Sequence, residues 1–246
     1  MDVLNTCSRL KDLKQGQQIH AQIVFDGFER TLSIGNALLN MYAKCDDDGD
    51  SDSFSEVSRM FNRLPSQDVI AWTTLISAYV GHGNEEKALE CFDQMKGVGI
   101  HPNAYTYVCT LKACSNVLEK GRIYEDTSLV NTIHKGIKDL DAKTKVLDTD
   151  GNVVDGIQIY STEMHTHAQD KVFDAIQKGK QIHAEVQRVE LDSDLFVGST
   201  LVRFYAKSGL FPQAWEVFNK MVIRDVVVWT TMIGELTEHG LGKEAL

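Results

Sequence analysis

The sequence predicts an all-α fold, an α-solenoid of stacked helix-turn-helix repeats. The main observation is an internal duplication: residues 15–45 align without a gap with residues 178–208, and residues 68–89 align with residues 225–246. Apolar residues recur with helical spacing in these segments, and the chain has only 3 prolines. Segments that repeat in this way stack on their neighbours instead of folding around one centre, so we expect an array of similar units.

Residues 69–103 illustrate one unit. Apolar side chains from Trp72 to Val80 have the spacing of one helical face, and Gly81 interrupts that helix. Asn84 is a suitable N-cap for a second helix, which has two glutamates in its first turn. The segment therefore predicts a single helical hairpin.

The neighbouring segments predict hairpins of different lengths. In order, the units are a long one at 1–31, a short one at 32–68, a standard one at 69–103, a long one at 104–194, a short one at 195–225 and a standard one at 226–246. The second long unit is enlarged by an insertion. We therefore expect repeats over 1–120, an insertion over 121–177 and repeats again over 178–246.

The insertion resembles no repeat. Residues 126–140 and 168–177 have amphipathic helical spacing, whereas residues 144–147 and 153–160 predict two strands of a small β-hairpin joined by a turn at 148–152. Two interpretations stay open for this segment: a protruding lobe, or non-coding sequence translated in a gene model.

The composition sets few limits on function. The net charge of −10 is unusual for a nucleic-acid-binding protein, but the excess of acid lies in residues 46–56 and 121–177, and the repeats themselves are close to neutral. No run of apolar residues is long enough for a membrane span, and we expect no membrane partner. The sequence begins and ends inside helical units, so we expect a piece of a longer protein.

Three motifs resemble catalytic or metal sites, and we expect none to act as one. The sequence His183-Ala184-Glu185 resembles the start of a zinc deaminase motif, but the chain has no CxxC to complete it. The calcium-loop-like segment at 148–152 lacks the later glycine and glutamate, and the histidines and glutamate at 163–167 fit a surface loop. We expect no enzyme activity, cofactor or metal.

The five cysteines also form no CxxC motif. Cys7 and Cys114 occupy matching places in two repeats. We therefore expect small, half-buried helix positions, without disulfides or metal.

Several longer strings carry a family resemblance. The segments 16–29 (GQQIHAQIVFDGFE), 35–45 (GNALLNMYAKC), 68–103 (DVIAWTTLISAYVGHGNEEKALECFDQMKGVGIHPN) and 197–209 (VGSTLVRFYAKSG) resemble the plant pentatricopeptide repeat (PPR) proteins of the mixed-length PLS subclass. The resemblance implies binding of single-stranded organellar RNA, one base per repeat. It also implies a mitochondrial or chloroplast protein that specifies sites of RNA processing or C-to-U RNA editing, together with other editing factors.

The resemblance assigns a pair of residues to each base. The pairs are Asn36 with Asp68 for U, Thr73 with Asn103 for A, Val108 with Asp194 for no firm preference, and Ser199 with Asp225 for G, while Thr230 alone suggests a purine. The implied footprint is 5′-U-A-N-G-purine-3′. The expected base wedges are Ser33, Ile70, Tyr105, Phe196 and Val227, and the expected phosphate contacts are Lys44 and Lys207.

Structural roles for the same residues stay open. Asn36, Thr73 and Ser199 could be ordinary polar residues of a helix interior, and Asp68 and Asp225 could be N-caps as well as base contacts. An alternative function is a peptide-binding scaffold of the tetratricopeptide kind. Units of that kind keep a constant length of about 34 residues, whereas these alternate.

Overall fold

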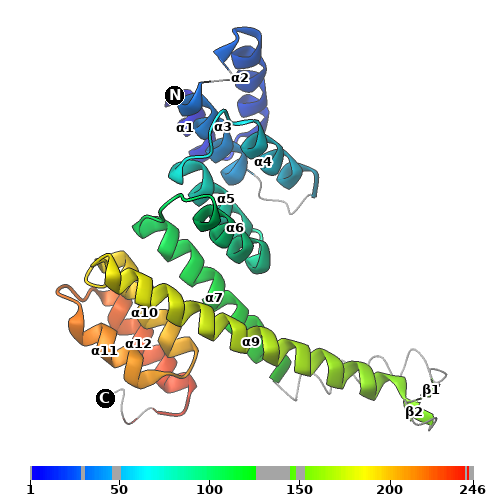
Figure 1. Cartoon of the computed structure of the whole chain (residues 1–246), viewed down its shortest axis with the longest axis vertical. Helices are drawn as coiled ribbons and strands as arrows, with labels where there is room; N and C mark the ends of the chain where they lie inside the picture. Colours follow the sequence, from blue (N-terminus) through cyan, green and yellow to red (C-terminus); the bar gives the residue numbers. More distant parts are fainter. Residues whose placement is uncertain are drawn as a thin grey trace. The chain divides into compact units, whose positions relative to one another are not determined.

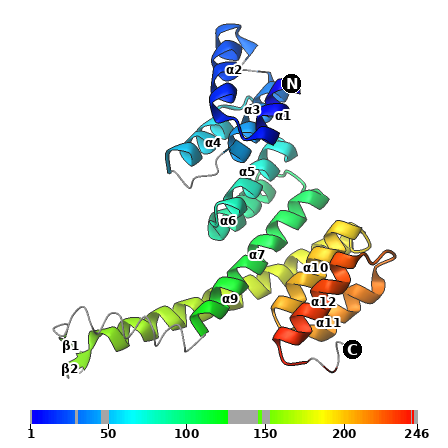
Figure 2. The same cartoon turned by 180° about the vertical axis from the view of Figure 1, so that it is seen from behind.

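The computed structural model describes residues 2–28, 31–45, 51–125, 145–147, 153–241 and 243. The chain forms two compact units, Met1–Ala113 and Cys114–Leu246, and the boundary lies inside one helix. Each unit is built from helical hairpins, as Figures 1 and 2 show from opposite sides.

The first unit contains three hairpins and the start of a fourth. The hairpins are α1 (Asp2–Leu10) with α2 (Leu13–Phe25), α3 (Leu32–Cys45) with α4 (Ser51–Arg63), and α5 (Val69–Gly81) with α6 (Glu85–Gly97), followed by α7 (Ala104–Glu125). The first helix of each hairpin packs on the first helix of the next, α1 on α3 and α3 on α5. The core of this unit therefore lies between two layers, one of first helices and one of second helices.

The second unit repeats this arrangement. It contains the strands β1 (Lys145–Leu147) and β2 (Val153–Asp155), then α9 (Gly156–Arg188), α10 (Leu195–Lys207), α11 (Phe211–Lys220) and α12 (Val226–Glu238). Helix α10 packs on both α11 and α12, as α3 packs on α4 and α5. The predicted all-α fold of helix-turn-helix repeats is confirmed.

The predicted repeat boundaries coincide with helix starts. The units expected to begin at 32, 69, 104, 195 and 226 begin there with α3, α5, α7, α10 and α12. Asn84 caps α6 as predicted, because its side chain accepts a hydrogen bond from the backbone N–H of Lys87. The local turn and cap signals of the sequence therefore locate the hairpins correctly.

The insertion lengthens two helices. Helix α7 has 22 residues and α9 has 33, against 13 in both α5 and α6, so helices run through the expected limits at 121 and 177. The expected helix at 168–177 is confirmed as part of α9. The expected helix at 126–140 and the turn at 148–152 lie outside the described residues.

The predicted β-hairpin is shorter than expected. Strands β1 and β2 pair antiparallel, with Lys145 opposite Asp155. Residues 156–160, expected to continue the second strand, begin α9 instead. A two-stranded ribbon is only marginally stable alone, whereas a helix that continues into packed repeats is stabilised by its apolar face.

A close contact between adjacent repeats occurs twice, at glycines that the duplication places in register. Gly16 of α2 lies against Met41 of α3, and Gly179 of α9 lies against Phe204 of α10. A methyl group at Gly179 would lie 2.1 Å from Cζ of Phe204, and one at Gly16 would lie 2.4 Å from Sδ of Met41. The fully buried side chain of one helix thus occupies the space that a side chain on the other would need.

The cysteines are packing residues. All five are free and buried, so Cys7 and Cys114 lie deeper than the half-buried positions predicted for them. Burial raises the pKa of Cys114 to about 12 and that of Cys91 to about 11, which disfavours the reactive thiolate.

Among the described residues, none of the helices combines the length and hydrophobicity that crossing a bilayer requires.

The two glycine contacts predict different costs for the same substitution. Gly→Ala in a helix gains about 1 kcal/mol of helix propensity, whereas overpacking a core costs about 1–3 kcal/mol. We expect Gly179→Ala to lower the free energy of unfolding, because the rigid Phe204 ring cannot move aside. Gly16→Ala should be close to neutral, because the unbranched Met41 side chain can adapt. Urea unfolding of both variants checks this, and an equal loss in both would contradict it.

Candidate nucleic-acid interface

At four repeat boundaries, the last residue of one repeat caps the first helix of the next. Asp68, Asn103, Asp194 and Asp225 each accept a hydrogen bond through Oδ1 from the backbone N–H three residues later, at 2.9, 2.9, 3.0 and 3.0 Å. An N-cap satisfies a helix-end N–H that otherwise has no partner in the helix. These four predicted base contacts are therefore fixed by the start of a helix, and the cap hydrogen bond itself uses only one of the two polar atoms of each side chain.

The structure brings the first predicted pair together. Nδ2 of Asn36 in α3 donates to both carboxylate oxygens of Asp68, at 3.2 and 3.1 Å. Asn36 is buried, and its Oδ1 has no hydrogen-bond partner among the described residues. The pair thus joins one repeat to the cap of the next and leaves an amide acceptor unused.

The second pair is joined through a third residue, Thr106, which the sequence analysis missed. The hydroxyl of Thr73 in α5 lies 2.7 Å from that of Thr106 in α7, and the Thr106 hydroxyl donates to Oδ1 of Asn103 at 3.0 Å. Thr73 is only 4 % exposed, whereas Asn103 is exposed, so Asn103 is the accessible member of the pair. A hydroxyl three residues after an asparagine cap is the sequence signal that could have revealed this link.

Among the described residues, no hydrogen bond pairs the remaining predicted base contacts. Ser199 donates to the carbonyl of Leu195 in its own helix, and Asp225 accepts a hydrogen bond from the cap N–H of Val228. Thr230 is exposed and donates to backbone carbonyls of α12. Val108 is half-buried in α7 and belongs to the first unit. Asp194 caps α10 and belongs to the second unit.

The predicted base wedges are all exposed. Each is the second residue of a first helix: Ser33, Ile70, Tyr105, Phe196 and Val227. The four apolar members are 56–73 % exposed, although the same helices bury their other apolar faces. A large apolar side chain exposed at one place in four helices is not needed by the core, so it is available to a ligand.

The two predicted phosphate contacts differ in environment. Lys44 is exposed at the end of α3. Lys207 at the matching place in α10 is only 8 % exposed, and its Nζ lies 2.5 Å from Glu119 of α7. A phosphate contact by Lys207 would have to displace Glu119 and stays a prediction.

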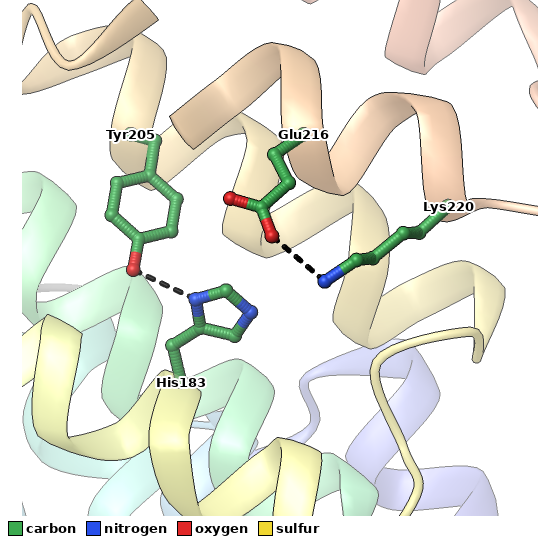
Figure 3. A network of polar contacts seen from close by, with 4 residues as sticks. All are labelled: His183, Tyr205, Glu216 and Lys220. Carbon is green, nitrogen blue, oxygen red and sulfur yellow. Dashed lines mark hydrogen bonds and ion pairs between the residues drawn. The ribbon is translucent and has the colours of Figure 1, made fainter. Parts of the chain in front are cut away.

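The histidine of the deaminase-like motif has a structural role. Nδ1 of His183 in α9 lies 2.8 Å from the hydroxyl of Tyr205 in α10, beside the ion pair of Glu216 and Lys220 (Figure 3). The duplicated residues, His20 and Tyr42, form the same contact at 2.8 Å. This histidine–tyrosine contact joins the second helix of one repeat to the first helix of the next.

The surroundings of His183 favour its neutral form. Burial lowers the pKa of His183, and the nearby Lys220 ammonium lowers it further, against smaller opposing effects of Glu216 and Asp192. Burial likewise raises the pKa of Tyr205 to about 12. A neutral imidazole hydrogen-bonded to a protonated phenol is therefore the stable state of this contact.

The lowered pKa of His183 predicts a pH-dependent stability. The unfolded chain binds a proton on this histidine below about pH 6.5, whereas the folded chain resists protonation until a lower pH. The free energy of unfolding should therefore fall as the pH drops below about 6.5. Urea unfolding between pH 5 and pH 8 measures this, and His183→Gln should show a weaker dependence. The same pH dependence in both proteins would contradict the assignment.

Comparisons with known proteins identify the repeats. Residues 67–116 match the PPR repeat family, and residues 199–226 match the PPR repeat. The pentatricopeptide repeat-containing protein At5g27110 of Arabidopsis thaliana is 28% identical over 289 residues, which cover 99% of this chain and 41% of the relative. The mitochondrial At3g24000 of the same plant is 29% identical over 291 residues, covering 99% of this chain and 45% of the relative.

A solved structure is also similar. It is that of the pentatricopeptide repeat protein PPR10 in complex with an 18-nt psaJ RNA element, with a TM-score of 0.40 and 16% identity over 94% of this chain and 31% of that one.

The chain spans less than half the length of the two curated relatives. The PLS subclass stays a prediction. The two family matches fall one in each copy of the duplication, so both copies contain segments that match pentatricopeptide repeats.

Proposed function

We propose that this chain binds single-stranded RNA, with one base at each repeat boundary. The observation that carries the proposal is a recurring pair: an exposed apolar side chain at the second position of a first helix, two residues after a polar side chain that caps the same helix. Stacking on an apolar side chain and hydrogen bonding to an adjacent polar one are the two interactions that hold an unpaired base.

The chemistry of the caps suggests how bases are distinguished. An aspartate only accepts hydrogen bonds, so it suits a base whose Watson–Crick edge has a ring N–H, guanine or uracil. An asparagine can also donate, so it suits a ring nitrogen without hydrogen, as in adenine or cytosine. Asp68, Asn103 and Asp225 fit the footprint 5′-U-A-N-G-purine-3′ implied by the family resemblance.

The wider role follows from the family resemblance. Relatives that share the repeats include proteins named as mitochondrial or chloroplastic, which supports an organellar location. We place the chain in the PLS subclass, within a factor that specifies sites of organellar RNA processing or C-to-U editing. In this proposal the chain supplies recognition, and other editing factors supply the chemistry.

A peptide-binding scaffold remains the competing function. Ile70, Tyr105, Phe196 and Val227 could in principle contact the apolar side chains of a peptide. The family matches are to pentatricopeptide repeats, however, and an aspartate or asparagine beside each apolar residue is suited to a base edge. Competition between RNA and peptides for the same protein separates the two functions.

The exposed Phe196 provides a test of the stacking contact. Loss of one base–aromatic contact costs about 1–3 kcal/mol, so Phe196→Ala should weaken RNA binding by about 5-fold or more. The melting temperature should not change, because the side chain is 73 % exposed. Phe173→Ala is the matched control, since Phe173 is also exposed but lies in α9, away from any repeat boundary. Fluorescence anisotropy with a footprint RNA measures both, and equal losses would argue against stacking at Phe196.

Asp225 provides a test of base recognition that leaves the fold intact. Asparagine caps a helix about as well as aspartate, so Asp225→Asn should keep the melting temperature. The base preferred at this repeat should change from G toward A, because a donor replaces an acceptor. Loss of one negative charge weakens the repulsion of the RNA phosphates and so raises the affinity for every RNA. Asp170→Asn, an exposed change on α9, loses the same charge and measures this general effect. The proposal fails if Asp225→Asn binds RNAs with G and with A in the wild-type ratio.

A further inference from the structure

Thr106 is the centre of a hydrogen-bond network at the boundary between the third and fourth repeats. Its backbone N–H and its hydroxyl both donate to Oδ1 of Asn103, at 2.9 and 3.0 Å. Its hydroxyl oxygen also accepts from the backbone N–H of Asn103 at 3.2 Å and lies 2.7 Å from the hydroxyl of Thr73. Thr106 is fully buried, so no ligand can reach it directly.

One arrangement of protons satisfies every contact in this network. The Thr106 hydroxyl donates to Oδ1 of Asn103, which can only accept. In that arrangement Thr73 donates its own proton to Thr106. Thr73 thus keeps the Thr106 hydroxyl turned toward Asn103.

This network fixes the orientation of the Asn103 amide. Both acceptor sites of Oδ1 are occupied by Thr106, and Nδ2 makes no hydrogen bond to any described residue. A flipped amide would point its NH₂ group at the backbone N–H of Thr106 and lose both hydrogen bonds. The accessible polar group of Asn103 is therefore a donor only.

We propose that Thr106 is a positioning residue that determines base specificity at the Thr73–Asn103 site, by presenting only the donors of Asn103 to the base. The inference rests on the proposed RNA binding. Two N–H donors match the unprotonated ring nitrogen of adenine or cytosine, and they oppose the ring N–H of guanine or uracil. Without the Thr106 hydroxyl, one of the two hydrogen bonds that hold Oδ1 is lost and only the backbone N–H remains, so the amide turns more readily and accepts from guanine or uracil as well.

The other boundaries support this role. The residues three positions after their caps are Ala71, Val197 and Val228, which have no hydroxyl. All three follow an aspartate cap, whose two oxygens are both acceptors, so no orientation has to be chosen. Among the four described caps of this kind, the one asparagine is the one that has a threonine at this place.

The test uses Thr106→Val in the full chain, because valine keeps the shape of threonine and removes only the hydroxyl. Four RNAs that differ only at the second base of the footprint are compared by competition binding. We expect the wild type to favour A or C over G and U by about tenfold, the effect of one unpaired polar group. Thr106→Val should reduce this ratio to about threefold or less, whereas Thr106→Ser should retain it.

Two controls separate positioning from a general loss of stability. Thr110→Val removes another fully buried hydroxyl of α7, which bonds only to the carbonyl of Thr106, and it should keep the wild-type ratio. In an Asn103→Asp background, which prefers G or U, adding Thr106→Val should leave the preference unchanged, because a carboxylate needs no orientation.

The outcomes distinguish this inference from the proposed function. A wild-type ratio in Thr106→Val, with base preference present in the wild type, would overturn the role of Thr106 alone. A wild type that binds all four RNAs equally, or none, would overturn base recognition at this site and with it the inference. A change of ratio in Thr110→Val as large as that in Thr106→Val would assign the effect to general packing and also overturn it.

Discussion

The capping of a first helix by the last residue of the preceding repeat is the constraint on which the rest of the structure depends. A helix start exposes backbone N–H groups, and Asp68, Asn103, Asp194 and Asp225 satisfy one at each of four boundaries. The geometry of the cap sets where each repeat ends, and it also sets where a polar side chain stands beside an exposed apolar one. One hydrogen bond therefore links the stability of a helix to the chemistry available at its end.

Contacts between repeats use a different set of residues. The glycines that admit Met41 and Phe204, and the histidines that bond Tyr42 and Tyr205, lie on second helices and hold them to the first helix of the next repeat. None of these residues is a candidate base contact. The duplicated copies therefore keep the same glycine and histidine contacts while their pairs, Asn36–Asp68 and Ser199–Asp225, differ.

The sequence predicts local features of this fold well. Helix starts at 32, 69, 104, 195 and 226 could be predicted because caps, glycines and apolar spacing are encoded within a few residues of each boundary. The closeness of Asn36 and Asp68 could be expected from the family resemblance and is confirmed as a direct hydrogen bond. The helical conformation of residues 156–160 could not be predicted, because the alternating apolar pattern there also suits a strand.

The features that could not be predicted depend on residues far apart in the sequence. The ion pair of Lys207 with Glu119 joins residues from two repeats, and no local pattern reveals it. The burial of Thr73 likewise depends on the packing of α7 against α5, through the hydroxyl of Thr106. In both cases the residue type suggested a polar surface role, and a neighbouring repeat changed its environment.

The network around Thr106 has a consequence for engineering such arrays. Asn103 ends one repeat by sequence, yet the side chain that orients it belongs to the following one. A graft that joins a new segment after residue 103 would transfer the Asn103 amide without the Thr106 hydroxyl that hydrogen-bonds to it. A segment exchanged between such arrays should therefore not end at the boundary of the sequence repeat. It must extend at least three residues into the next helix.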